Sequence, residues 1–225
     1  MVVLTATMQG MSDASFSNLR IDYGDEALHR ADLPTEPVAM FRSWLELAAG
    51  AGVREPNAMS LATCDEHGQP HCRVVLLKHL DDRGFGFFTN KLSSKGQQLR
   101  ANARAAATFW WVAPCSRQVR IEGVITELPE SEAEAYFASR PRRAQLCSAA
   151  SPQSQVVKDR AELEGYVDAL EQQTGEGAVS KPAHWGGYTL TPDRVEFWQG
   201  RDGRLHDRFQ FVREGVAWQI DRLAP

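Results

Sequence analysis

The first strong pattern in the chain is a run of apolar positions at helical spacing. The positions i, i+3, i+4 and i+7 of this run are occupied by Phe41, Trp44, Leu45 and Ala48. Such spacing places side chains on one face of an α-helix. We therefore predict an amphipathic helix over about residues 35–51, with Thr35 as its N-cap.

From residue 58 onward the pattern changes to short apolar and β-branched runs, separated by turn-forming clusters such as DEHGQP and DDRG. These runs predict strands at residues 58–64, 71–78, 85–90, 106–112, 118–128, 187–191, 194–199, 204–212 and 217–221. Helical patterns predict helices at about residues 93–102, 131–139 and 155–173. In the second of these, Ser131 and Glu134 have the spacing of a capping box. Many short strands with frequent turns indicate a β-dominated α+β fold, an antiparallel barrel with helices around its outside.

The domain organisation is expected to be simple. Residues 1–33 are polar with scattered apolar positions, and we expect a partly mobile N-terminal arm or cover there. No linker divides the rest, so residues 34–225 are predicted to form a single domain, a size that can bury a substantial core.

Composition narrows the functional classes. The chain is 43% hydrophobic and 24% charged with a formal net charge of −4, and an acidic balance argues against a nucleic-acid partner. No apolar stretch is long enough to span a membrane and the start lacks the features of a secretory signal, so we expect a cytoplasmic protein. The four cysteines form no CxxC pair or metal-ligand spacing, so we predict no metal site and expect them to be buried small hydrophobes.

One predicted strand carries an unusual face. If residues 204–212 are a strand, Arg204, His206 and Arg208 project to the same side, because side chains alternate along a strand. Two cations beside an imidazole repel each other unless an anionic or electron-rich group lies against them. The pattern is therefore compatible with a site for an anionic ligand, and equally with a solvated polar face.

Three further segments carry cations, and two of them favour phosphate binding. The helix start at Ser93-Ser94-Lys95 offers free backbone amides, two hydroxyls and a lysine, although Ser93 as a plain N-cap would explain it as well. Arg73 and Lys78 bound an apolar strand, but their odd separation places them on opposite faces of a regular strand. Tyr136 and Arg140, at i and i+4, share a helix face and can converge on one oxyanion.

Common catalytic motifs are absent from the sequence. It contains no Walker A loop, no GxGxxG after a strand, no GxSxG elbow and no HExxH. What remains is two phosphate-friendly clusters, a cationic face with a histidine, and nearby tryptophans. A flat aromatic cofactor with a phosphate tail, together with a small phosphorylated ligand, would use all of them.

Several stretches together carry a specific resemblance, from about Leu19 to Pro225. They are RVVLLK at 73–78, FTN at 88–90, SRPR at 139–142, WGG at 185–187, VEFWQG at 195–200, RLHDR at 204–208 and the terminal DRLAP. With these motifs the chain resembles the pyridoxamine/pyridoxine 5′-phosphate oxidase family of FMN-dependent flavoproteins. The resemblance implies an antiparallel split β-barrel, and a homodimer with each FMN bound between the subunits.

The resemblance also implies roles for individual residues. FMN contacts are implied for Arg73, Val74, Val75, Leu76, Lys78, Phe88, Thr89, Ser94, Lys95, Gln118, Gln153, Ser154, Trp198 and Arg208. Contacts to a phosphorylated B6-vitamer substrate are implied for Arg20, Tyr23, Lys78, Tyr136, Arg140, Ala144, Arg204 and His206. Of these, Arg204 and His206 would flank the substrate ring as the catalytic pair, and the segment with Arg20 and Tyr23 would cover the substrate.

Two positions depart from the family pattern. The family often has an arginine where this chain has Ser94, and a serine where it has Ala144. Each departure removes a phosphate contact that is typically equivalent to about 1.5–3 kcal/mol. Arg143 is a candidate to compensate for Ala144.

The implied activity is oxidation of pyridoxamine and pyridoxine 5′-phosphates to pyridoxal 5′-phosphate, with dioxygen as the electron acceptor. Two alternatives stay open: a related split-barrel flavoenzyme that oxidises another aromatic compound, as in phenazine biosynthesis, and a non-catalytic protein that binds flavin or pyridoxal phosphate.

Overall fold

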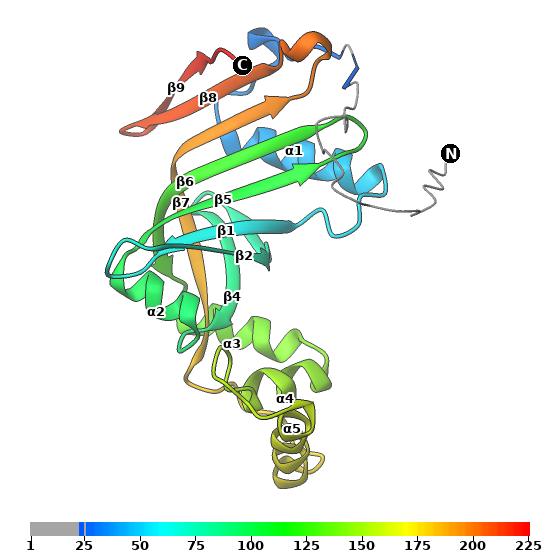
Figure 1. The fold of residues 1–225 in the computed structure, drawn as a ribbon, viewed down its shortest axis with the longest axis vertical. Coiled ribbons are helices and arrows are strands. Elements are labelled where there is room, and N and C mark those ends of the chain that lie inside the picture. The colour runs from blue at the N-terminus through cyan, green and yellow to red at the C-terminus, as the bar shows by residue number, and fades with distance from the viewer. Residues whose placement is uncertain (1–22, 25) are drawn as a thin grey trace, which may run out of the picture.

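The computed structural model describes residues 23–24 and 26–225, whose elements are labelled in Figure 1. The strands of this part of the chain are β1 (Ala58–Cys64), β2 (Pro70–Leu76), β3 (His79–Asp81), β4 (Gly84–Asn90), β5 (Arg104–Trp111), β6 (Arg117–Glu127), β7 (Trp185–Gln199), β8 (Asp207–Glu214) and β9 (Ala217–Arg222). The α-helices are α1 (Pro37–Gly50), α2 (Ser94–Ala101), α3 (Glu130–Ser139), α4 (Arg142–Ala150) and α5 (Arg160–Thr174). Short 3₁₀ turns lie at Arg30–Asp32 and Asp202–Arg204.

All the strands form one curled antiparallel sheet, in which β7 is shared between two halves. The order is β2-β1-β5-β6-β7-β4-β3, and β8 and β9 continue from β7. One edge of β7 pairs with β6, while its other edge pairs with β4 over residues 185–190 and with β8 over residues 194–199. The sheet therefore divides at the middle of β7, which confirms the predicted split antiparallel architecture.

The bend in β7 explains why the sequence predicted two strands there. Pro192 cannot donate a ladder hydrogen bond, and its partner Gly123 sits where the register with β6 shifts. A Cβ on Gly123 would lie 2.0 Å from the carbonyl oxygen of Thr191, so only glycine fits. A proline between two apolar runs suggested a break, but the backbone stays extended and only bends.

Helix α1 packs on the sheet through the apolar face predicted for it. Phe41 is fully buried, with its ring 4.8 Å from Phe85 and 4.7 Å from Phe109, centroid to centroid. The expected Thr35 cap is wrong, because Glu36 is the N-cap residue and makes no side-chain cap, and Pro37 occupies the first turn instead.

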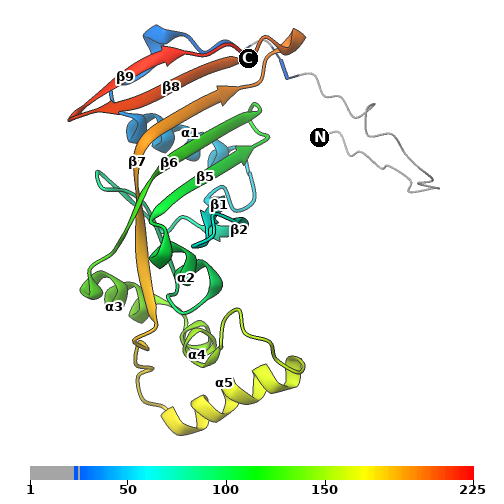
Figure 2. The same cartoon turned by 60° about the vertical axis from the view of Figure 1, so that its left-hand side comes forward.

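Helices α3, α4 and α5 form a separate layer at one end of the sheet, seen in both orientations (Figures 1 and 2). Their apolar contact with the sheet includes a small buried cluster of Ala133, Phe137 and Trp185. The predicted capping box is wrong, since α3 already begins at Glu130, after Pro129 in the N-cap position. The predicted 155–173 helix begins later, at Arg160, where the Asp159 carboxylate accepts from the Glu162 N–H.

Helix α4 and strand β3 had no predicted counterpart. Helix α4 reads RRAQLCSAA, which has no continuous apolar face, and β3 is only three residues long. Neither offers the periodicity from which short elements are recognised.

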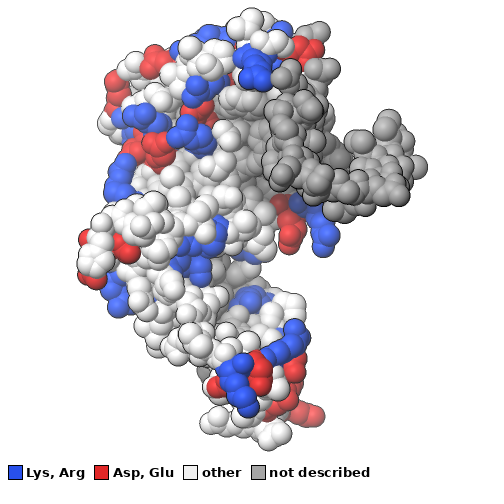
Figure 3. Space-filling view, in the orientation of Figure 1, with Lys and Arg blue, Asp and Glu red and all other residues white. Residues whose placement is uncertain are grey.

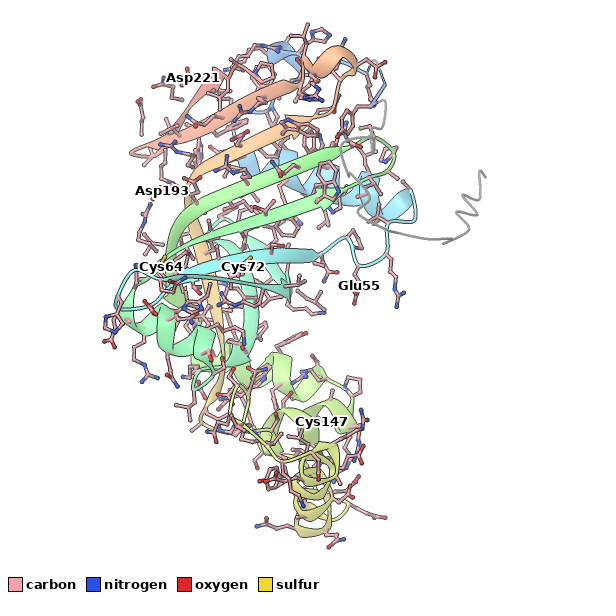
Figure 4. All side chains as sticks on the ribbon, viewed as in Figure 1. Glu55, Cys64, Cys72, Cys147, Asp193 and Asp221 are labelled. Carbon is pink, nitrogen blue, oxygen red and sulfur yellow. The ribbon has the colours of Figure 1, made fainter. Side chains whose placement is uncertain are left out.

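The cysteines are unpaired but are not all buried. All four are free, Cys72 and Cys147 are exposed, and Cys64 and Cys115 are half-buried, so the expected burial is wrong. Figure 4 shows Cys64 and Cys72 on the neighbouring strands β1 and β2, and Cys147 on the helical layer. Cys72 lies opposite Ala62, so the two hairpin thiols are not cross-strand partners.

Charge is distributed in small mixed groups. On the face drawn in Figure 3, basic and acidic side chains adjoin one another over the upper sheet and again on the lower helices. In the described part of the chain, no helix is long and apolar enough to cross a bilayer.

Candidate functional site

A cavity of about 410 Å³ lies where the end of the sheet meets helices α3 and α4. Its size is within the range of small-molecule sites. The lining combines strand residues of β2 and β4 with side chains from the helical layer, and consists of Val74, Val75, Leu76, Lys78, Phe88, Thr89, Asn90, Lys95, Tyr136, Arg140, Cys147, Ser148, Ser151, Gln153 and Trp185. Ten of these were predicted as site residues, from segments far apart in the chain.

Cations without acidic partners surround this cavity. Lys78, Lys95 and Arg140 line it, and Arg73 lies directly behind Lys95. Within the part of the chain that the structure describes, none of these four forms an ion pair with aspartate or glutamate. Lys78 is exposed, whereas Arg73, Lys95 and Arg140 are partly buried. Partly buried positive charge without a counter-ion is costly, so these three favour a bound anion.

Lys95 is held by neutral acceptors. Its ammonium donates to Thr89 Oγ1 at 3.2 Å, Ser93 Oγ at 3.3 Å and Gln153 Oε1 at 3.2 Å. Burial, and then the charge of Arg73, hold the pKa of Lys95 below its usual value. Ser93 is indeed the N-cap of α2, as its Oγ accepts from the Gly96 N–H. The N-cap interpretation of this segment is confirmed, whereas the phosphate site stays a prediction, with Lys95 among the residues that line the cavity.

Arg73 is a second layer behind the lining residues. Its guanidinium donates to Leu61 O at 3.0 Å, Thr63 Oγ1 at 2.7 Å and Gln98 Oε1 at 2.8 Å. Strand β2 ends at Leu76, before Lys78, so the parity conflict between Arg73 and Lys78 does not arise. The Lys78 side chain is free to reach the cavity while Arg73 faces α2.

Aromatic rings form one wall of the cavity. Three rings stack against one another, with centroid separations of 4.2 Å for Phe88–Tyr136, 5.3 Å for Phe88–Trp185 and 6.1 Å for Tyr136–Trp185. The Arg140 guanidinium lies 5.2 Å from the centroid of Trp185, and its Nη1 donates to Ser148 Oγ at 2.8 Å. The predicted convergence of Tyr136 and Arg140 is confirmed as geometry, since both line the same cavity.

A second cluster lies at the other end of β7. The rings of Tyr23, Trp198 and His206 contact one another, with centroid separations of 5.7 Å for Tyr23–Trp198, 5.4 Å for Tyr23–His206 and 4.7 Å for Trp198–His206. The backbone N–H groups of Tyr23 and Gly24 both donate to the Asp202 carboxylate at 3.0 Å. These two bonds attach the segment with Tyr23 to the turn that precedes His206.

The backbone of this cluster differs from the prediction. Residues 204–206 precede the strand, since β8 begins at Asp207, and Arg204 lies in the 3₁₀ turn with a φ of 62°. The prediction that Arg204, His206 and Arg208 share one face of a strand is therefore wrong. Only Arg208 is in the strand, and it is neutralised by Glu196, with Nε 2.8 Å from Oε1.

His206 is held in a defined orientation. Its Nδ1 accepts from the Arg201 backbone N–H at 3.1 Å, which leaves Nε2 as the ring nitrogen that carries a proton. Burial, and then the charge of Arg204, lower the pKa of His206. A lowered pKa favours the neutral imidazole, which can donate from Nε2.

The remaining predicted residues fall in different places. Gln118 on β6 lies opposite Trp198 on β7. Ser94 borders a different hollow, beside Asp65 and His71, and is not among the residues that line the cavity. Ser154 follows Gln153 with a φ of 73°. Ala144 is half-buried on α4. Arg20 lies outside the described residues.

Sequence reasoning missed five of the lining residues as site residues: Asn90, Cys147, Ser148, Ser151 and Trp185. Trp185 begins the WGG stretch, one of the motifs of the family resemblance, which was a signal for it. The three residues on or after α4 gave none, because that helix was not predicted.

The two clusters are separated by most of strand β7. Trp185 lines the cavity near one end of the strand and Trp198 belongs to the second cluster near the other. At a rise of about 3.3 Å per residue, the strand between them measures roughly 40 Å. One small ligand therefore does not contact both clusters within one chain.

Comparison with known proteins identifies the family to which the chain belongs. Residues 45–174 match the family model described as pyridoxamine 5′-phosphate oxidase, and residues 185–225 match the model described as the pyridoxine 5′-phosphate oxidase C-terminal dimerisation region. Pyridoxine/pyridoxamine 5′-phosphate oxidases from Pseudomonas paraeruginosa and Synechocystis are 49% and 47% identical to it. These alignments cover 94% and 96% of this chain and 99% and 100% of theirs.

Solved structures share the fold of this chain. The structure of PhzG from Burkholderia lata, in complex with tetrahydrophenazine-1-carboxylic acid, superposes with a TM-score of 0.83 at 33% identity, covering 90% of this chain and all of that one. An FMN-binding protein from Nostoc punctiforme shares the fold with a TM-score of 0.68 at 15% identity, covering 86% of this chain and 99% of its own. By sequence and by fold, this chain belongs to the pyridoxamine 5′-phosphate oxidase family.

Proposed function

We propose that this protein oxidises pyridoxamine 5′-phosphate and pyridoxine 5′-phosphate to pyridoxal 5′-phosphate, with FMN as its cofactor and dioxygen as the electron acceptor. The observation that carries the proposal is the cavity flanked by Lys78, Lys95, Arg140 and Arg73, none of them paired with a carboxylate in the described chain. Two phosphate-bearing ligands would supply the missing negative charge.

The residues present fit FMN. Lys95, with Arg73 behind it, offers positive charge to the flavin phosphate, and Thr89 and Gln153 offer polar contacts beside it. Val74 and Leu76, both lining the cavity, provide apolar surface for the flavin ring. When bound, FMN would supply the redox chemistry, accepting hydride from the substrate's 4′ carbon and passing the electrons to dioxygen, which leaves as hydrogen peroxide. With the amine substrate, water would then hydrolyse the imine product and ammonia would leave.

The substrate phosphate would bind at the other side of the cavity. Lys78, Tyr136 and Arg140 all line the cavity and would hold the phosphate, so that the ring is oriented rather than merely bound. Because Arg140 is fixed over Trp185, its guanidinium loses little freedom when it binds.

Arg204 and His206 would act on the substrate ring from a second subunit. They lie at the far end of β7 from the cavity, and residues 185–225 match a dimerisation region. We propose a homodimer in which each FMN lies between subunits, with Gln118, Trp198 and Arg208 of one subunit completing the flavin site of the other. His206 would donate from Nε2 to a ring substituent, and Arg204 would supply positive charge.

The likeness to PhzG favours a second candidate, oxidation of an unphosphorylated aromatic acid. The cations around the cavity argue against it, because such a substrate needs no phosphate site. A third candidate is a non-catalytic carrier of flavin or pyridoxal phosphate.

We also propose a cytoplasmic location, because the four cysteines are all unpaired.

One assay separates these candidates. Purified protein loaded with FMN is supplied with pyridoxamine 5′-phosphate, pyridoxine 5′-phosphate or unphosphorylated pyridoxamine, and hydrogen peroxide and pyridoxal 5′-phosphate are measured. We expect turnover with the two phosphorylated compounds and little with the third. Equal turnover of phosphorylated and unphosphorylated amine would contradict the phosphate site, and binding without peroxide would indicate a carrier.

A further inference from the structure

Helix α4 presents one hydroxyl to the cavity. Within Arg142–Ala150 the only serine or threonine is Ser148, and it lines the cavity together with Arg140. Arg140 Nη1 donates to Ser148 Oγ at 2.8 Å. The serine is therefore fixed against the guanidinium that the proposed function assigns to the substrate phosphate.

The hydroxyl still has a proton to donate. Ser148 Oγ accepts the bond from Arg140, and the described residues provide no acceptor for its own O–H. A serine hydroxyl can accept and donate at the same time. An oxyanion beside Arg140 would thus receive one hydrogen bond from the guanidinium and one from Ser148.

The neighbouring positions on α4 cannot take this role. Ala144, one turn earlier on the same face, has no hydroxyl. Arg143, the compensator expected from the sequence, points to α5 instead, with Nη1 3.3 Å from Glu171 Oε2 and 3.8 Å from Asp168 Oδ1. Ser148 is the residue of this helix with the geometry for it.

We propose that Ser148 is a phosphate-binding residue. Its hydroxyl would compensate for the one that the family pattern has at position 144 and that Ala144 lacks. It would accept from Arg140, fixing the guanidinium, and would donate to the phosphate of the B6-vitamer substrate. This inference rests on the proposed function, since it assigns a further residue to the same site.

The test is the substitution Ser148→Ala in the FMN-loaded protein. Losing a hydrogen bond to a charged acceptor should raise the KM for pyridoxamine 5′-phosphate about ten- to a hundredfold, with kcat changed less than about threefold. Competitive inhibition by inorganic phosphate should weaken in parallel. Flavin affinity should stay at the wild-type value, which separates the substrate phosphate from that of FMN.

Three further variants make the result specific. Ser148→Thr keeps the hydroxyl and should retain a KM near wild type. Ala144→Ser combined with Ser148→Ala returns a hydroxyl one turn earlier and should recover part of the lost affinity. The matched control, Arg143→Ala on the same helix, should leave KM unchanged. Thermal unfolding of each variant tests whether α4 remains folded.

The outcomes distinguish a failure of the proposed function from a failure of the Ser148 assignment. If the wild-type protein does not oxidise phosphorylated vitamers, the proposed function fails. If it does, and Ser148→Ala leaves both KM and phosphate inhibition unchanged, the assignment of Ser148 is wrong. Equal losses in Ser148→Ala and Ser148→Thr, with lowered thermal stability, would also overturn it in favour of a packing role.

Discussion

Lys95 shows at the residue scale how a site for an anion is recognised without the anion. Its three hydrogen-bond partners are neutral oxygens, and its pKa is lowered by burial and by Arg73. A phosphate would reverse that electrostatic penalty. Lys91, four residues earlier, is different, because its Nζ lies 3.3 Å from Glu127 Oε2 and is already neutralised.

This contrast gives the first prediction. Lys95→Met should weaken FMN binding about ten- to a hundredfold, because one charge-assisted phosphate contact is lost. Lys91→Met is the matched control and should bind FMN as the wild type does. Quenching of flavin fluorescence during titration of the apoprotein measures both. Similar affinities in the two variants would show that Lys95 is not part of the flavin site.

The second prediction concerns His206 and Arg204. Burial and the charge of Arg204 lower the pKa of His206, so Arg204→Gln should raise that pKa toward its usual value. NMR titration of the histidine ring signals measures the change. The same variant should keep FMN but lose about tenfold or more in turnover, because positive charge at the substrate ring is removed. An unchanged pKa, or unchanged kinetics, would contradict the assigned role.

Apolar periodicity predicted the helices and strands that are determined by burial of one face. It did not predict the segments whose conformation is determined by local backbone geometry. Helix α1 and most strands follow from apolar spacing, since each buries one face. The turn with Arg204 does not, because a left-handed φ at an arginine is set by the neighbouring Gly203 and by contacts to Asp202 from Tyr23 and Gly24. Helix α4 was missed because its sequence has no apolar stripe, although it supplies Ser148.

The start of β8 is fixed to the beginning of the described chain by one carboxylate. Asp207 is 7% exposed, accepts from the Leu28 N–H at 3.0 Å, and pairs with Arg222 at 2.5 Å and Arg201 at 3.5 Å. Burial opposes its ionisation, but the bonds from Leu28 and Arg222 outweigh burial and lower its pKa below 3.8.

The third prediction follows from this clamp. Asp207→Asn should lower the free energy of unfolding by about 1–3 kcal/mol at pH 7, because Arg222 and Arg201 lose their partner. Since the folded-state pKa is the lower one, the stabilisation is complete above the unfolded pKa near 3.8 and is lost as pH falls below it. The difference between variant and wild type in urea unfolding should therefore shrink at pH 3. Asp221→Asn, whose carboxylate contacts only Gln219 among the described side chains, is the control.

At the scale of the whole molecule, spacing along the sequence could not show that the predicted site residues form two groups. Ten predicted residues between Val74 and Gln153 line the cavity, whereas Tyr23, Trp198 and His206 gather at the other end of β7. Both groups were predicted as parts of one site through the family resemblance. A site assembled from two copies of the chain reconciles these facts, because two-fold symmetry can place one end of a subunit against the other end of its partner.

Mixed dimers test that assembly. Arg140→Gln and Arg204→Gln should each be nearly inactive as homodimers, since every site lacks one group. In a heterodimer of the two, one site carries both changes and the other carries neither, if each site draws on both subunits. Co-unfolding and refolding equal amounts, followed by the peroxide assay, should then recover about a quarter of wild-type activity, because half of the dimers are mixed and half of their sites are intact. A mixture no more active than its parents would show that Arg140 and Arg204 serve the same site from one chain, and the roughly 40 Å of strand between the two clusters would then have to be bridged in another way.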